Sequence, residues 1–172
     1  MQNPSALALL TELVTDLLQI QLQLIKWLPV LSDRANHPGL RHLIGKHVDQ
    51  SRAHAGRLHE FFTARDATPV TGISQAIKLI IEDSGNKNSP ADPDRADLLH
   101  TIQILRVEQF EITSYEIVAR VADQLGFEME SGMLLEFLAE RDASASVLRD
   151  LQGDLLNHAF PTVVGPPPPF DE

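Results

Sequence analysis

The sequence predicts an all-α fold, an antiparallel four-helix bundle with a short extra helix in its central crossover. Apolar residues recur at intervals of three and four along four long segments, which is the spacing of one helix face. Proline and glycine collect between these segments, where they end helices. No alternating run rich in Val, Ile, Thr and aromatic residues predicts a strand. Two helix pairs joined by a longer middle connection are the arrangement of a four-helix bundle with a crossover.

The first helix pair occupies the N-terminal part of the chain. We expect the first helix at residues 5–31, with Pro29 near its end. The second begins around Pro38, because proline suits the first helical turn, and continues to about residue 64. The connection that follows is predicted to contain a short helix at 73–83, where isoleucines have helical spacing, and then a loop.

The second helix pair is followed by a tail. We expect the third helix at 93–124, ending before Gly126, and the fourth at 128–157. Four consecutive prolines near the C-terminus favour an extended conformation there. We therefore predict one domain at 1–158 and an extended Pro-rich tail at 159–172, which could dock on a neighbouring subunit or recruit a protein partner.

Composition narrows the class of protein. The net charge is −10 and the sequence pI about 5.0, so nucleic acids and anionic membranes would repel the chain. There is no cysteine, which excludes disulfides, thiol catalysis and Cys-ligated metals. The N-terminal Leu-rich stretch has no preceding basic residues and is interrupted by Glu12 and Asp16, and no run of about 18 apolar residues follows. We expect a soluble, cytoplasmic protein that binds neither nucleic acid nor membrane.

Each predicted helix has a narrow inward stripe that polar residues interrupt near its middle. For the first helix the stripe is Leu10, Val14, Leu17, Gln21, Leu24 and Leu28. For the fourth helix it is Met133, Phe137, Glu140, Ser144, Val147, Leu151 and Leu155. The polar interruptions in the second and third helices are His47, Gln50, His54, Glu108 and Glu111. Because mid-helix positions of an antiparallel bundle meet at one level, these polar residues are predicted to form one buried layer.

Glu108 and Glu111 suggest the chemistry of this layer. They lie three residues apart, so both carboxylates share one helix face. Burying them is costly unless a metal ion, a proton or hydrogen-bond donors compensate their charge. Ferritin-like bundles bind two metal ions at this place, using one Glu from each of two helices and a Glu-x-x-His pair from each of the others. Carboxylates and imidazoles suit iron or manganese, so Glu108, Glu111 and Glu140 are candidate metal ligands.

The ligand set for two ions is incomplete. Gln21 and Gln50 are neutral amides, and no histidine follows Gln50 or the fourth-helix acid at the required three-residue spacing. Three carboxylates leave the four positive charges of two divalent ions undercompensated. One alternative is a single ion that also uses His47 or His54. The other is no metal at all, with amide donors and a shared proton satisfying the acids.

The chain resembles the YciE/YciF-like family of bacterial ferritin-like proteins over most of its four long helices. The resemblance rests on residues 16–29 (DLLQIQLQLIKWLP), 47–50 with Arg57-Leu58, 107–115 (VEQFEITSY), 122–126 (ADQLG), and Leu138 with Glu140. It implies a rubrerythrin-type dinuclear carboxylate bundle, often dimeric and loosely associated with stress responses. By position it implies Glu108, Glu111 and Glu140 as metal ligands, whereas Gln21 and Gln50 stand where the family pattern has Glu.

Three functions remain open from the sequence. The first is a ferritin-like, stress-associated bacterial protein with a degenerate carboxylate site that binds one ion or none. The second is an oxidoreductase with a di-iron or iron/manganese centre, acting as a peroxidase or ferroxidase. The third is a non-catalytic protein-interaction module. A homodimer is expected in each case, from the resemblance and from the prevalence of two-fold symmetry.

Overall fold

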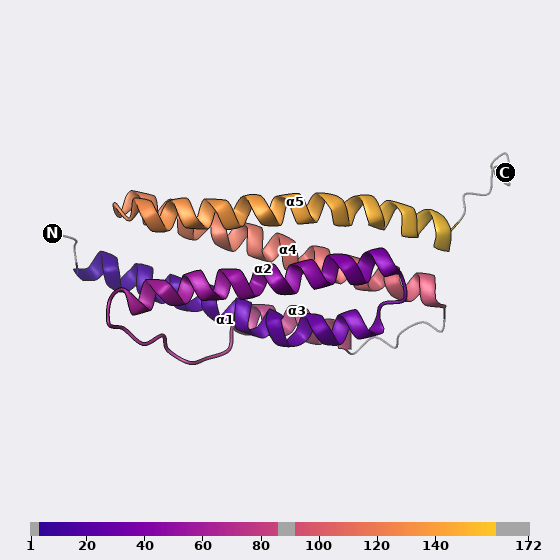
Figure 1. Ribbon diagram of the computed structural model, residues 1–172, viewed down its shortest axis with the longest axis horizontal. Coiled ribbons are helices and arrows are strands. Elements are labelled where there is room, and N and C mark those ends of the chain that lie inside the picture. The colour runs from indigo at the N-terminus through magenta and orange to yellow at the C-terminus, as the bar shows by residue number, and fades with distance from the viewer. Residues whose placement is uncertain (1–3, 86–91, 161–172) are drawn as a thin grey trace, which may run out of the picture.

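The computed structural model describes residues 4–85 and 92–160, which form five helices and no strand. They are α1 (Pro4–Arg34), α2 (Pro38–Thr63), α3 (Gln75–Gly85), α4 (Pro93–Gln124) and α5 (Glu128–Ala159) (Figure 1). The predicted all-α architecture is confirmed, including the short helix in the crossover. Residues 161–172, which hold most of the predicted tail, lie outside the described part of the chain, and Ala159 still belongs to α5.

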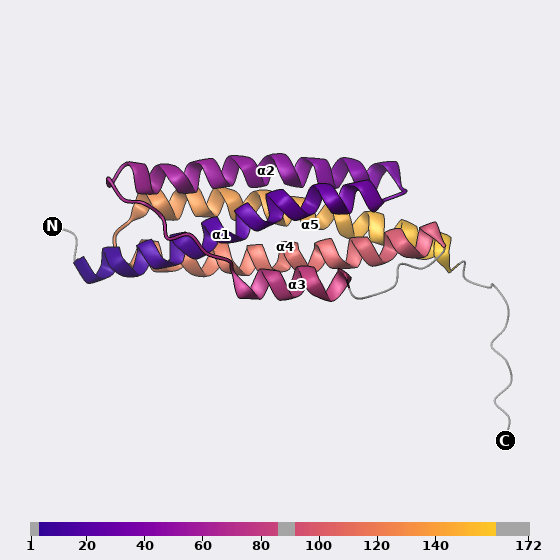
Figure 2. The ribbon, with the colours of Figure 1, turned by 90° about the horizontal axis from the view of Figure 1, so that it is seen from below.

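The four long helices lie side by side, each antiparallel to its neighbours. Helices α1 and α2 form one hairpin, and α4 and α5 form the other (Figures 1 and 2). The connection from α2 to α4 runs back along the bundle, which makes α2 and α4 parallel. Helix α3 lies in this connection, on the outside of the bundle against α1 and α4 (Figure 2). All four long helices therefore bring their midpoints to one level.

Local sequence signals account for the helix ends. The Asp92 carboxylate caps α4 by accepting from the Asp94 backbone N–H at 3.0 Å. Gly126 has a φ of +80°, a conformation that favours glycine, and it turns the chain between α4 and α5. Pro29 lies inside α1, which continues to Arg34, because Leu31 is buried in the core beyond the proline.

Two glutamines of α1 fix the crossover to the bundle. Gln19 donates from its amide nitrogen to the Val70 carbonyl at 3.2 Å. Gln23 accepts from the Ser74 N–H at 2.8 Å and donates to its carbonyl at 3.3 Å. These bonds hold the segment that leads into α3, whose Ile77 is fully buried.

The core confirms the inward stripe predicted for α1, since all six of its residues are buried. By length and composition α1 is also apolar enough to cross a membrane, alone among the helices of the described residues. That is weak evidence for a membrane span, because the core helix of a soluble bundle passes the same test. In this structure the apolar side chains of the stripe pack against the other helices.

Candidate functional site

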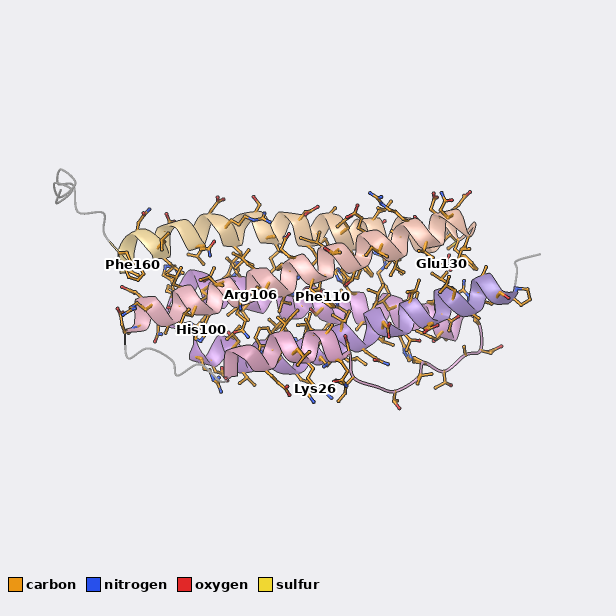
Figure 3. The ribbon with its side chains drawn as sticks, turned by 180° about the vertical axis from the view of Figure 1, so that it is seen from behind. Lys26, His100, Arg106, Phe110, Glu130 and Phe160 are labelled. Atoms are coloured by element: carbon orange, nitrogen blue, oxygen red, sulfur yellow. The ribbon has the colours of Figure 1, made fainter. Side chains whose placement is uncertain are left out.

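The polar layer lies in the middle of the bundle. Phe110, which lies between the two carboxylates along α4, is labelled about midway between Glu130 and Phe160 at the two ends of α5 (Figure 3). The helical spacing of Glu108 and Glu111 points both carboxylates inward, and their residues are 0% and 1% exposed. Gln21 of α1 and His47 of α2 are buried beside them. The structure thus places these four predicted residues together.

Glu111 is fully satisfied by hydrogen bonds. The Gln21 amide donates to one of its carboxylate oxygens at 2.8 Å, and His47 Nε2 lies 2.8 Å from the other. An ionised carboxylate only accepts, so His47 donates through Nε2. Burial alone would raise the pKa of Glu111, but the charges of His47 and Arg141 and these hydrogen bonds hold it at about 2. Glu111 is therefore the permanent anion of the layer.

Glu108 is held less tightly. One of its oxygens lies 3.3 Å from His47 Nδ1, and both lie 3.4 Å from Nη1 of Arg141. Burial raises the pKa of Glu108 from 4.5 to about 7, and the nearby charges of His47 and Arg141 limit the rise. The two adjacent carboxyl groups therefore have very different pKa values. Glu111 stays ionised, whereas Glu108 exchanges its proton near neutral pH.

Arg141 is the functional residue that the sequence reading missed. It comes from α5 and is 0% exposed. Besides its contacts with Glu108, its Nη1 lies 3.9 Å from a Glu111 oxygen, and its Nη2 donates to the Gln50 side-chain carbonyl. A guanidinium of permanent positive charge is thereby buried among the acids. A sequence signal existed, because position 141 is in register with Leu134, Phe137, Ala145 and Leu148, all buried.

The predicted inward stripe of α5 is confirmed at Phe137 and Leu155 but is wrong in register over residues 140–147, and Glu140 is the residue most affected. Its side chain is 46% exposed, so it lies at the margin of the layer and not inside it. There it accepts from the Gln50 amide at 3.2 Å and lies 3.1 Å from His54 Nε2. Val147 of the predicted stripe is likewise exposed. Positions three and four residues beyond Phe137 both suit the inward face, and the structure places Arg141 there because the acids of α4 compensate its charge.

An aromatic layer lies next to the polar one. The His54 ring stacks on Phe137 with centroids 3.8 Å apart, and its Nδ1 lies 3.0 Å from the Tyr115 hydroxyl. Burial lowers the pKa of His54 and raises that of Tyr115 well above its ordinary value. Both groups are therefore uncharged at neutral pH, and His54 connects Tyr115 to Glu140 at the surface.

Within residues 4–85 and 92–160, one group of side chains could hold a metal ion. His47, Glu108 and Glu111 each offer a ligand atom, and these atoms lie within 4.8 Å of one another. Buried side-chain atoms of the layer that lack a hydrogen-bond partner among the described residues are Gln21 Oε1, His47 Nδ1, Glu108 Oε2 and Arg141 Nε. The two oxygens among them, together with an imidazole nitrogen, suit one small cation. They do not suit two, because Glu140 is outside the layer, Gln21 and Gln50 supply no charge, and the Arg141 guanidinium lies against both inner carboxylates.

Comparisons with known proteins agree with this fold. The family model described as "Domain of unknown function (DUF892)" matches residues 5–160. No curated protein matches the sequence. The chain is similar in structure to the E. coli stress protein YciF, with a TM-score of 0.81 and 21% identity, over 90% of this chain and 99% of that one.

Two further solved structures have the same fold. YcfI from Rhodopseudomonas palustris matches with a TM-score of 0.78 and 23% identity, over 84% of this chain and 92% of that one. A protein from Xanthomonas campestris matches with a TM-score of 0.71 and 14% identity, over 90% and 94%. At these identities the likeness establishes the fold. The match of the family model to residues 5–160 shows that the chain belongs to the DUF892 family, and its YciF-like helical bundle agrees with the resemblance seen in the sequence.

Proposed function

We propose that this protein is a ferritin-like, stress-associated bacterial protein whose central carboxylate site binds one metal ion or none and performs no two-metal redox chemistry. The observation that supports this most directly is the buried Arg141 guanidinium, 3.4 Å from both oxygens of Glu108 and 3.9 Å from Glu111. Stress association is extended to this chain from the name of its E. coli structural relative.

The charges of the layer favour this proposal over an oxidoreductase. Two divalent ions would add four positive charges to a layer whose inner anions are Glu108 and Glu111. The guanidinium of Arg141, a side chain of α5, already compensates these anions, and His47 contacts both of them. A dinuclear peroxidase or ferroxidase centre would require both Arg141 and His47 to move away from the two carboxylates. The chemistry that remains for this layer is structural, since it holds α1, α2, α4 and α5 together through Gln21, His47, Glu111 and Arg141.

A single ion is the second candidate, and a specific observation favours it. His47, Glu108 and Glu111 provide three ligand atoms, and neighbouring acceptors lack partners. Iron or manganese would suit these ligands. Such an ion would leave the layer mononuclear.

Metal content tests the proposal. The full chain is purified from cells supplemented with iron and manganese, and the metal per chain is measured by elemental analysis. We expect less than about one ion per chain, and oxidation of Fe²⁺ or reduction of peroxide at the rate of buffer containing the same iron. Two tightly bound ions per chain, or turnover that disappears in Glu111→Gln, would overturn the proposal.

The cellular part of the proposal is a soluble, cytoplasmic homodimer whose Pro-rich tail contacts a protein partner. Fractionation and light scattering of the full chain test location and stoichiometry. Comparison of proteins co-purifying with the full chain and with a chain ending at residue 160 tests the tail. Protein abundance after osmotic or peroxide challenge tests stress association, and unchanged abundance under both would contradict it.

A further inference from the structure

We infer that Arg141 is a built-in cation that replaces metal in the central site, so that the layer becomes a divalent-metal site when this one charge is removed. The inference rests on the proposed function of a site with one ion or none, and it names the residue that decides between those two states. It goes beyond the family resemblance, which implies a metal centre at this place.

The contacts of Arg141 support a role as a bridging cation. A metal ion in a helical bundle joins acids from different helices through one positive centre. The Arg141 guanidinium contacts Glu108 and Glu111 on α4 through Nη1 and Gln50 on α2 through Nη2, while its own stem belongs to α5. Three helices are thus joined through one buried positive group. The residue is 0% exposed, so little solvent screens it.

The chemistry of arginine makes the replacement permanent. A guanidinium stays protonated throughout the range in which proteins fold, whereas a lysine or histidine that is buried without an acidic partner loses its charge. An ion bound by His47, Glu108 and Glu111 would share the Glu108 oxygens that Arg141 contacts at 3.4 Å. Like charges at such separation in a dry layer repel strongly. Arg141 therefore opposes a divalent ion both by charge and by occupying the space beside its ligands.

The other polar groups of the layer offer ligand atoms to a cation once the guanidinium is removed. Without the guanidinium, Glu108 would lose its closest positive partner besides His47. His47 Nδ1, Glu108 Oε2 and Gln21 Oε1 are buried atoms with no hydrogen-bond partner among the described residues. Together with the two carboxylates they supply nitrogen and oxygen ligands on three helices. Charge and ligand chemistry both point to a divalent transition-metal ion.

Cobalt binding to metal-free full-length protein tests the inference. Co²⁺ is titrated at pH 7.5 into wild type and Arg141→Gln, with binding followed by visible absorption and by the change in melting temperature. Arg141→Gln keeps hydrogen-bonding capacity toward Gln50 and Glu108 but removes the charge. We expect one Co²⁺ per chain in this variant, an affinity at least tenfold tighter than in wild type, and a melting temperature that rises with Co²⁺.

Two matched variants assign the effect. Arg141→Lys retains a positive charge and is expected to bind Co²⁺ no better than wild type. The double variant Arg141→Gln with Glu111→Gln removes one ligand and is expected to lose the gained binding. Equal Co²⁺ affinity in wild type, Arg141→Lys and Arg141→Gln would overturn the inference, as would gained binding that survives the loss of Glu111.

A second variant covers the case in which Arg141→Gln does not fold in the absence of Co²⁺. Arg141→Ala is then examined beside it, and folding of either variant only when Co²⁺ is present supports the inference. Failure of both to fold with and without Co²⁺ would overturn it, because the arginine would then have a purely structural role. These outcomes differ from failure of the proposed function, which requires two tight ions in the wild-type chain.

Discussion

Replacing Arg141 with Met in the metal-free protein measures how strongly the central layer depends on its internal cation. Methionine is long and flexible, so it retains much of the buried volume while removing the charge. The substitution leaves Glu108 and Glu111 without the guanidinium that lies 3.4 and 3.9 Å from their oxygens. Breaking a buried ion pair by removing one partner costs about 3–5 kcal/mol. We expect a loss of this size in the free energy of unfolding at alkaline pH.

The loss should depend on pH in a direction set by Glu108. Its folded-state pKa is already raised to about 7, above its ordinary 4.5, and without Arg141 it rises further. At pH 6 Glu108 is mostly protonated in both folded proteins, so Glu111 is the inner carboxylate that loses an opposite charge there. At pH 8.5 Glu108 is ionised in wild type, where Arg141 compensates it. Each unit by which Arg141 lowers this pKa therefore adds about 1.4 kcal/mol to the loss between pH 6 and pH 8.5.

Urea unfolding followed by circular dichroism, with EDTA present, gives the free energies at both pH values. Arg120→Met is the matched control, because Arg120 is 77% exposed and pairs with Glu116 across one turn of α4. The control should lose less than about 1 kcal/mol at either pH. The reasoning is refuted if Arg141→Met loses no more than the control at pH 8.5, or if its loss is smaller at pH 8.5 than at pH 6.

Three further predictions concern other parts of the fold. The raised pKa of Glu108 should make wild-type stability decline as pH rises from 4.5 to about 7, because the protonated carboxyl group favours the folded state. Glu108→Gln should remove this decline, and urea unfolding across this pH range measures it. Asp97→Ala should cost about 1–3 kcal/mol by urea unfolding, because its buried carboxylate accepts from the Asn36 and His37 backbone N–H groups at 2.8 and 2.6 Å. Gly126→Ala should cost about 1 kcal/mol in the same assay, because φ is +80° there.

Sequence reasoning succeeded where several independent signals agreed. The inward stripe of α1 is rich in leucine, its polar interruption Gln21 is flanked by apolar residues at the same spacing, and all of it is buried. Helix starts followed from Pro38 and Pro93, whose rings fix φ, and the end of α4 followed from Gly126, which readily adopts a positive φ. Periodicity and backbone chemistry are local properties, so a single sequence contains them.

Sequence reasoning failed in the middle of α5, over residues 140–147, because two different helical stripes can be drawn through this segment. Ser144 and Val147 continue the stripe through Glu140, whereas Ala145 and Leu148 continue the one through Arg141. An expected metal site favours Glu140 as the inward residue, and the usual exposure of arginine argues against Arg141 in that place. The deciding energy is the contact between Arg141 and the acids of α4, which are about thirty residues away along the chain. No local pattern in α5 contains that information.

The glutamines and the arginine of the layer together meet one electrostatic requirement. If Arg141 supplies the positive charge that metal ions would supply, fewer anions are needed, and acids at positions 21 and 50 would leave uncompensated negative charge. Amides meet this requirement, because each has both a donor and an acceptor. Gln21 donates to Glu111, while Gln50 accepts from Arg141 and donates to Glu140. The two amides and the guanidinium therefore satisfy a layer with two inner carboxylates, and an acid at position 21 or 50 beside Arg141 would add a negative charge that the layer does not compensate.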